Sequence, residues 1–330
     1  MATPTSVRAP RIGIFDSGIG GLSVLRAVRQ RLPQAQCHYL ADSQFTPWGD
    51  RAPAWVVARC QQVSQHLMAE GADLVLVACN TATTQAIAAL RRRWPGQPFV
   101  GIEPGIKPAA GATRNGRVAV LATPGTMRSP RLAHLVHAHA RQVSVLRLPC
   151  PGLVEAIEAA DVQPQALIDQ LDAISHSLRQ ADVDTVVLGC THYPLVAAAL
   201  AQRLGPGVLL VDTADAVARQ VASLLPRAAA ESTWAATAAA AAAAAATTTA
   251  AAAVHRPAEP QVAGLLPTAA WPPCLLSTGP PAVLQAAARR WLGLDLPVGL
   301  LRLPDPADPH DPQDDPQENP AHLSSPPTRG

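Results

Sequence analysis

Short apolar runs alternate with longer amphipathic stretches over most of this chain of 330 residues. The runs at 11–15, 74–77 and 185–188 have the length and β-branched content of buried strands, and the stretches between such runs fit helices. Strands that alternate with helices form parallel sheets covered on both faces. The pattern therefore predicts an α/β fold built on doubly wound parallel sheets.

The same pattern places the other elements. Further strands are expected at 38–40, 99–102, 143–148, 208–211 and 298–303, and helices are expected from residue 22, over 53–70 and up to residues 94, 135, 204 and 226. The alternating pattern continues at 117–126 and 150–160, and one further strand and helix are expected over 274–292.

Two segments share one design, GADLVLVACNTAT and DVDTVVLGCTHYP. Each has an Asp, a short apolar strand and then a Cys, and the two thiols, Cys79 and Cys190, are 111 residues apart. Gly189 allows a sharp turn after the second strand, and Pro194 can open a helix. Open α/β sheets bind ligands at the carboxyl ends of their strands. We therefore expect two similar halves that face each other across a cleft, with one substrate between two thiols.

The domain organisation follows from these elements and from shifts in composition. Residues 228–273 begin with a tract of nearly pure Ala and Thr that has no hydrophobic period, and we interpret them as an insertion. The Pro- and Asp-rich tail is expected to be disordered. The predicted parts are a flexible lead at 1–10, a discontinuous first domain at 11–102 plus 208–303, a second domain at 103–207, and a tail at 304–330.

Composition excludes several classes of function. The net charge of +2 and the absence of a basic stripe argue against nucleic-acid binding. The N-terminus lacks an apolar signal core and no stretch could span a bilayer, so a cytoplasmic protein with no membrane contact is expected. The six cysteines form no CxxC pair, which argues against zinc and disulfides. We interpret Cys37, Cys60 and Cys274 as small buried residues.

Two loops offer candidate ligand contacts. The strand at 11–15 ends at Asp16 and Ser17, and a glycine-rich turn then leads to a helix whose first N–H groups could face an anion. The GxGG spacing is not a dinucleotide fingerprint, and a plain turn between strand and helix is the alternative. The loop around Pro47, Trp48 and Gly49 could form one wall of a site.

The two thiols limit the chemistry. A single Cys beside His192 would suit acyl transfer. A second equivalent Cys suits racemisation, in which one group removes a proton from one face of a carbon and another returns a proton to the opposite face. A thiol with a pKa of about 8.5 is only about 3% ionised at pH 7, so each Cys needs a partner. Asp16 and His192 are the candidates.

Seven short motifs together resemble glutamate racemase, of the aspartate/glutamate racemase family. They occur in this order: IGIFDSGIGGLSVL, ADSQFTPWGD, VACNTAT, GIEPGIKPA, VLATPGT, CPGLVEAIE and LGCTHYPL. The resemblance covers about residues 11–226 and 274–303. It implies a cofactor-independent isomerase that interconverts L- and D-glutamate for peptidoglycan synthesis and hence for cell-wall biogenesis and cell shape, with two α/β domains around the site.

The resemblance also implies roles for individual residues. Cys79 and Cys190 match the two proton donors and acceptors, and Asp16, Glu158 and His192 match the auxiliary acid/base positions. The substrate-binding positions are Asp16, Ser17, Trp48, Gly49, Asn80, Thr81, Thr191 and His192. Neutral donors among them suit the two carboxylates of glutamate. No metal or cofactor is expected.

The chain departs from the family pattern at Trp48, where Tyr is usual, and in its insertion and tail. Two alternatives stay open: a related racemase that acts on aspartate, and a binding or regulatory module that keeps the fold. The sequence leaves the oligomeric state open, a homodimer included.

Overall fold

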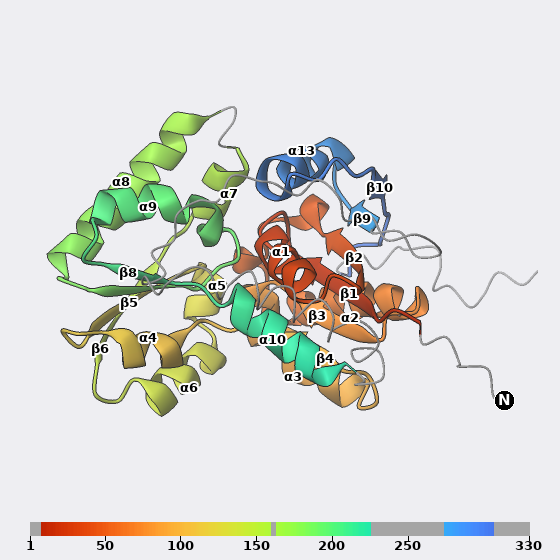
Figure 1. Ribbon diagram of the computed structural model, residues 1–330, viewed down its shortest axis with the longest axis horizontal. Helices are drawn as coiled ribbons and strands as arrows, with labels where there is room; N and C mark the ends of the chain where they lie inside the picture. The colour runs from red at the N-terminus through yellow and green to blue at the C-terminus, as the bar shows by residue number, and fades with distance from the viewer. Residues whose placement is uncertain (1–7, 160–162, 226–273, 307–330) are drawn as a thin grey trace, which may run out of the picture.

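In the computed structural model the described residues are 8–159, 163–225 and 274–306 (Figure 1). They form two parallel sheets, each wound with helices, which lie side by side in Figure 1. The doubly wound α/β prediction is confirmed. The insertion predicted at 228–273 and most of the predicted tail lie outside the described residues. Within the described ranges, no helix combines the length and apolarity needed to cross a bilayer.

The first sheet has six strands in the order β10-β9-β2-β1-β3-β4, all parallel. Its strands are β1 (Arg11–Asp16), β2 (Gln36–Ala41), β3 (Leu74–Val77), β4 (Phe99–Gly101), β9 (Cys274–Ser277) and β10 (Val298–Leu300). The helices α1 (Leu22–Arg31), α10 (Ala214–Leu224) and α13 (Pro281–Leu292) contribute to one core cluster, and α2 (Pro53–Ala69) and α3 (Asn80–Arg93) contribute to a second. Apolar side chains of the strands enter both clusters, so both faces of the sheet are covered.

The second sheet has four parallel strands in the order β6-β5-β7-β8. Its strands are β5 (Arg117–Ala122), β6 (Ser144–Pro149), β7 (Thr185–Leu188) and β8 (Leu209–Val211). Around it are α4 (Ile106–Ala112), α5 (Pro124–Met127), α6 (Pro130–His139), α7 (Leu153–Glu158), α8 (Pro164–Gln180) and α9 (Ala197–Leu204). Two further core clusters cover its faces, one with α7, α8 and α9 and the other with α4 and α6.

The two sheets repeat one topology. The order β2-β1-β3-β4 in the first sheet matches β6-β5-β7-β8 in the second, so the strands that precede Cys79 and Cys190 hold equivalent central positions. Each runs beside the first strand of its own half, β3 beside β1 and β7 beside β5. The predicted similarity of the two halves is therefore present in the strand order itself.

The structure departs from the sequence-based predictions at four places. Cys274, which we interpreted as a buried residue, is only partly buried. The strand predicted at 208–211, which we assigned to the first domain, pairs with β7 in the second sheet, and the chain returns to the first sheet only at α10. The helix expected to open at Pro194 begins as a 3₁₀ turn, Tyr193–Val196, before α9. Residues 304–306, which we assigned to a disordered tail, are held against α2 by hydrogen bonds. The remaining domain boundaries stay a prediction.

The Asp that precedes each central strand has a structural role. Asp73 accepts a hydrogen bond from the backbone N–H of Arg11 at 2.8 Å. Asp184 accepts from the backbone N–H groups of Arg114 and Asn115 at 2.6 and 2.8 Å and from the Thr113 hydroxyl at 2.6 Å. Burial favours the neutral form of Asp184, but the hydrogen bonds outweigh burial and lower its pKa to about 2.

We predict that Asp184→Ala lowers the free energy of unfolding by about 3 kcal/mol at pH 7, because two backbone N–H groups lose their acceptor. The lowered pKa gives the sign of the pH dependence. The contribution of Asp184 is complete above its ordinary value of 3.8 and is lost as the pH falls toward about 2. Urea unfolding at pH 7 and pH 3 measures both effects.

A matched control is Asp172→Ala, since Asp172 forms an exposed ion pair with Arg203 at 2.6 Å. Such pairs contribute less than about 1 kcal/mol. Equal losses in the two variants would contradict the assigned role of Asp184.

Candidate active site

A small cavity lies where the carboxyl ends of the two sheets meet. Its volume is about 20 Å³, enough for about one water molecule. Both thiols line it, so the structure brings the two equivalent strand ends to one cavity. The lining residues are Ser17, Pro47, Trp48, Gly49, Cys79, Asn80, Thr81, Thr123, Val154, Cys190, Thr191 and His192.

Cys79 lies at the junction of β3 and α3. It is the N-cap residue of α3, and its Sγ accepts a hydrogen bond from the backbone N–H of Ala82 at 3.5 Å. The Ser17 hydroxyl, just after β1, lies 3.5 Å from the same sulfur. The thiol is therefore held between the ends of two neighbouring strands, at the amino end of a helix that favours negative charge.

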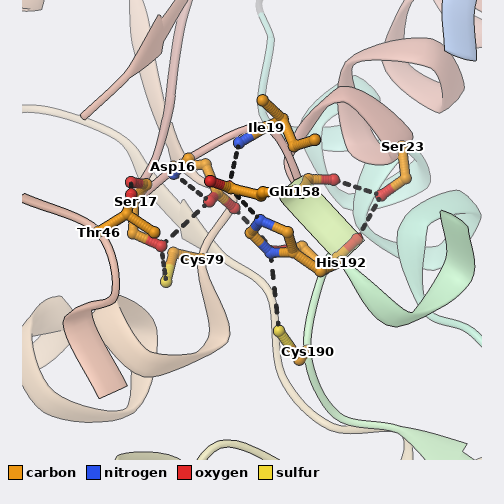
Figure 2. A network of polar contacts seen from close by, with 12 residues as sticks. Asp16, Ser17, Ile19, Ser23, Thr46, Cys79, Glu158, Cys190 and His192 are labelled. Carbon is orange, nitrogen blue, oxygen red and sulfur yellow. Dashed lines mark hydrogen bonds and ion pairs between the residues drawn. The ribbon is translucent and has the colours of Figure 1, made fainter. Parts of the chain in front are cut away.

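Cys190 lies at the equivalent place after β7, beside a histidine. Its Sγ is 3.9 Å from Nδ1 of His192, whose Nε2 is 2.8 Å from Oε1 of Glu158, the last residue of α7 (Figure 2). His192 is 1% exposed. Oε1 of Glu158 also accepts a long hydrogen bond of 3.4 Å from the backbone N–H of Ile19 in the first domain.

Asp16 connects the two halves of the site. It is fully buried, and its Oδ1 accepts from the backbone N–H of Gly18 at 2.9 Å. Its Oδ2 accepts from the Thr191 hydroxyl, which belongs to the second domain, at 2.8 Å. Figure 2 shows Asp16 between the Ser17–Cys79 pair and the Glu158–His192 pair. Thr191 follows Cys190 directly in the chain, so this bond ties the segment that carries the second thiol to the first domain.

Burial controls the protonation of the first-domain side of the site. It raises the pKa of Asp16, although the charge of His192 and the hydrogen bonds from Gly18, Thr191 and Ser17 act in the opposite direction. Burial, with the nearby charge of Asp16, also raises the pKa of Cys79 to about 12. The Cys79 thiol is therefore protonated at neutral pH.

The second-domain side has the opposite balance. Burial disfavours the charged form of His192, but its contacts with Cys190 and Glu158 outweigh burial and hold its pKa well above 6.5. Burial also favours neutral Glu158, yet the hydrogen bond and the charge of His192 lower the pKa of Glu158 below 4.5. The pair is thus an ion pair at neutral pH, and a protonated imidazole can donate one N–H to Glu158 and direct the other toward Cys190.

Comparisons with known proteins agree with this geometry. The model of the Asp/Glu/hydantoin racemase family matches residues 22–221. The chain belongs to that family. Glutamate racemase from Pseudomonas aeruginosa is 46% identical over 223 residues, which are 67% of this chain and 83% of that protein. The resemblance to glutamate racemase that the seven motifs indicated is therefore confirmed.

Solved structures of relatives share the racemase fold. Glutamate racemase isoform RacE1 from Bacillus anthracis has a TM-score of 0.71 at 26% identity and covers 90% of this chain and 99% of that one. The Escherichia coli glutamate racemase, solved with L-glutamate and an activator, has a TM-score of 0.60 at 38% identity, with 66% and 82% covered.

The neutral donors expected in this racemase site lie together. Asn80 and Thr81 occupy the first turn of α3, and the Thr81 hydroxyl is 2.9 Å from that of Thr123, which follows β5. Oδ1 of Asn80 is buried and has no hydrogen-bond partner among the described residues. An acceptor without a partner at the cavity lining suits a ligand that donates a hydrogen bond there.

The loop between β2 and α2 forms one wall of the cavity, as the sequence suggested. Trp48 is 1% exposed, and its ring packs against Phe15 and Trp55 at centroid distances of 6.5 and 5.7 Å. Gly49 lies against the second domain, where an added Cβ would be 3.0 Å from the Cβ of Thr123. A side chain at position 49 would therefore crowd Thr123 across the contact between the two domains.

Sequence reasoning missed two lining residues, Val154 and Thr123. Thr123 could have been found from the repeat, because it follows β5 in the way that Ser17 follows β1. Val154 carries no polar group that could have identified it. Among the described residues, no three His, Cys, Asp or Glu side chains converge to hold a metal ion.

We predict a specific pH dependence for Glu158→Gln. The ion pair adds stability that is complete between about pH 4.5 and 6.5, the ordinary pKa values of the two groups. It is lost on acidification as Glu158 takes up a proton, and lost as the pH rises through the raised His192 pKa. Urea unfolding should show the variant about 2 kcal/mol less stable at pH 6, with a smaller difference at pH 10. A difference that increases from pH 6 to pH 10 would exclude this account.

Proposed function

We propose that this protein interconverts L- and D-glutamate by a two-base mechanism without a cofactor. The supporting observation is that Cys79 and Cys190, which follow equivalent strands of two repeated halves, line one cavity. Racemisation by proton exchange needs a base on one face of Cα and an acid on the other. Thiols from opposite domains supply both, and each becomes the other kind of group when the reaction runs in reverse.

The environments of the two thiols differ, and the difference suggests how the first proton moves. Cys79 is protonated in the free site, whereas Cys190 has the protonated His192 beside it at 3.9 Å. His192 can stabilise a thiolate at Cys190 by donating a hydrogen bond, while Glu158 keeps the imidazole charged. In this scheme Cys190 removes the Cα proton of one enantiomer and Cys79 protonates the opposite face. For the other enantiomer the roles are exchanged, with Asp16 as the auxiliary group beside Cys79.

Substrate recognition follows from charge and hydrogen-bonding capacity. Asp16 is the buried anion nearest Cys79 and is suited to the α-ammonium group, whose charge would offset the effect of Asp16 on the Cys79 pKa. The carboxylates would accept from Ser17, Asn80, Thr81, Thr191 and His192, and Trp48 and Gly49 would close the loop side. Glutamate is the proposed substrate because relatives at 46% and 38% identity are glutamate racemases.

The proposed biological role is the supply of D-glutamate for peptidoglycan in the cytoplasm. Aspartate is the alternative substrate, since the family includes racemases of both amino acids. A homodimer stays an open possibility, and we propose no nucleic-acid or membrane partner.

The deciding experiment is the loss of circular dichroism of L-glutamate on incubation with purified protein in D₂O. Proton exchange at Cα predicts that solvent deuterium appears at Cα of the product. Pyridoxal phosphate and EDTA should not change the rate. Faster turnover of aspartate than of glutamate would assign the alternative substrate, and product free of deuterium would contradict the two-base mechanism.

Cys79→Ala and Cys190→Ala should each lower kcat by at least about 1000-fold, because each step of proton exchange needs both thiols. Thermal unfolding should change little. The matched control is Cys60→Ala, since Cys60 is a buried thiol of the same core cluster as Cys79 but does not line the cavity. This variant should keep kcat within about threefold. Full activity in either active-site variant would remove that thiol from the mechanism.

The loop wall gives a second kinetic prediction. Trp48→Tyr should change kcat/KM by less than about tenfold, because a smaller ring can still pack against Trp55 and the chain keeps its backbone there. Gly49→Val should lower kcat/KM more, since its Cβ would be 3.0 Å from Thr123 and a branched side chain needs more room. The opposite order would show that the Trp48 ring itself contacts the substrate.

A further inference from the structure

The cavity wall at Trp48 and Gly49 depends on a segment from the far end of the chain. This segment, residues 301–305, follows β10 and is called the C-terminal strap here. Its Leu301 and Leu303 pack against the core cluster that contains Trp48, Phe45 and Cys79. The strap thus packs against the core from which the wall residue Trp48 comes, and none of its residues lines the cavity.

A buried ion pair holds the strap at Pro304. Arg59 of α2 donates Nε–H and Nη2–H to the two carboxylate oxygens of Asp42 at 2.9 and 2.6 Å, and both side chains have no exposed surface. Its third nitrogen, Nη1, donates to the Pro304 carbonyl at 2.6 Å and to Gln62 at 3.2 Å. A buried guanidinium needs all its donors satisfied, so the strap carbonyl is part of what keeps this pair stable.

The next residue of the strap, Asp305, reaches the cavity wall through one ring. Oδ1 of Asp305 accepts from Nε1 of Trp55 at 2.7 Å. The Trp55 ring meets Trp48 edge to face at 5.7 Å, and Trp48 lines the cavity. The guanidinium group of Arg51 lies over the Trp55 ring, 4.9 Å from the centroid of that ring. Because the hydrogen bond fixes the plane of Trp55, it also fixes the surface against which Trp48 packs.

We propose that Asp305 and Trp55 are positioning residues for substrate binding, and that the C-terminal strap holds the Trp48 wall in its binding position. This inference rests on the proposed racemisation. It separates two parts of the site. The thiols follow β3 and β7, whereas the strap contact is made with Trp55 of α2, so loss of this contact moves the wall and leaves the proton-transfer groups in place.

The test is steady-state racemisation kinetics of Asp305→Ala, Asp305→Asn and Trp55→Phe. Asp305→Ala and Trp55→Phe each remove the hydrogen bond and should raise KM for glutamate about three- to tenfold, with kcat within about twofold of wild type. Asp305→Asn keeps a carbonyl oxygen that can accept from Trp55 and should restore KM. The KM of the double variant Asp305→Ala/Trp55→Phe should not exceed the higher of the two single-variant KM values, because both changes break the same contact.

Asp295→Ala is the matched control. Asp295 lies in the same C-terminal region, pairs with Arg289 at 2.7 Å on the surface and has no contact with the cavity wall. Its KM should equal that of wild type. Wild-type protein without racemase activity would refute the proposed function. An active wild type with an unchanged KM in Asp305→Ala and Trp55→Phe, or with equal effects of Asp305→Asn and Asp305→Ala, would overturn this inference alone.

Discussion

The site depends on the buried Glu158–His192 ion pair and on its contacts with the first domain, where the buried Asp16 lies beside it. A charge taken out of water is costly unless a partner and hydrogen bonds replace its hydration. Asp16 comes from β1, Glu158 from α7 and His192 from the turn after β7, so the partners belong to different domains. The bonds from Thr191 to Asp16 and from Ile19 to Glu158 cross the cleft in both directions. The same contacts that make the charges tolerable therefore fix the positions of the two thiols relative to each other.

The repeated topology explains how two thiols come to face one another. Each half places its central strand beside its first strand, and the ends of these two strands carry Ser17 with Cys79 in one half and Thr123 with Cys190 in the other. A single sheet would present all its strand ends on one side of a substrate. Two sheets that meet at their carboxyl ends present groups on both faces, which a reaction that inverts a carbon centre requires. Asp73 and Asp184, which share the repeat, serve the loops at the opposite ends of the strands.

Much of this arrangement could be predicted, because the end of a buried parallel strand is marked in the sequence by an abrupt change from apolar to small polar residues. Asp16, Cys79 and His192 were found in that way. The strand that pairs with β8 could not be predicted, since a short apolar run indicates a strand but does not indicate which sheet that strand joins. The Asp42–Arg59 ion pair could not be predicted either, because a charged residue on a helix is usually exposed. Only the fold shows that these two side chains pair in a fully buried position. Residues 304–306 were misassigned for a similar reason: their Pro and Asp content is typical of a disordered tail, whereas two specific hydrogen bonds hold them.

The size of the cavity places a requirement on the protein's motion. A space of about 20 Å³ holds about one water, and any amino acid with two carboxylates is far larger. The cleft must therefore widen before a substrate can enter. One close contact between the two halves is made by small groups: a Cβ added at Gly125 would lie 2.5 Å from the Gly49 carbonyl. The dispersion attraction between groups that pack this closely is lost after a small separation, because it falls steeply with distance. The chain passes between the two sheets after β4 and again after β8, and each half keeps core clusters of its own, so these two crossings are the places where a change in backbone dihedral angles would alter the distance between the strand ends.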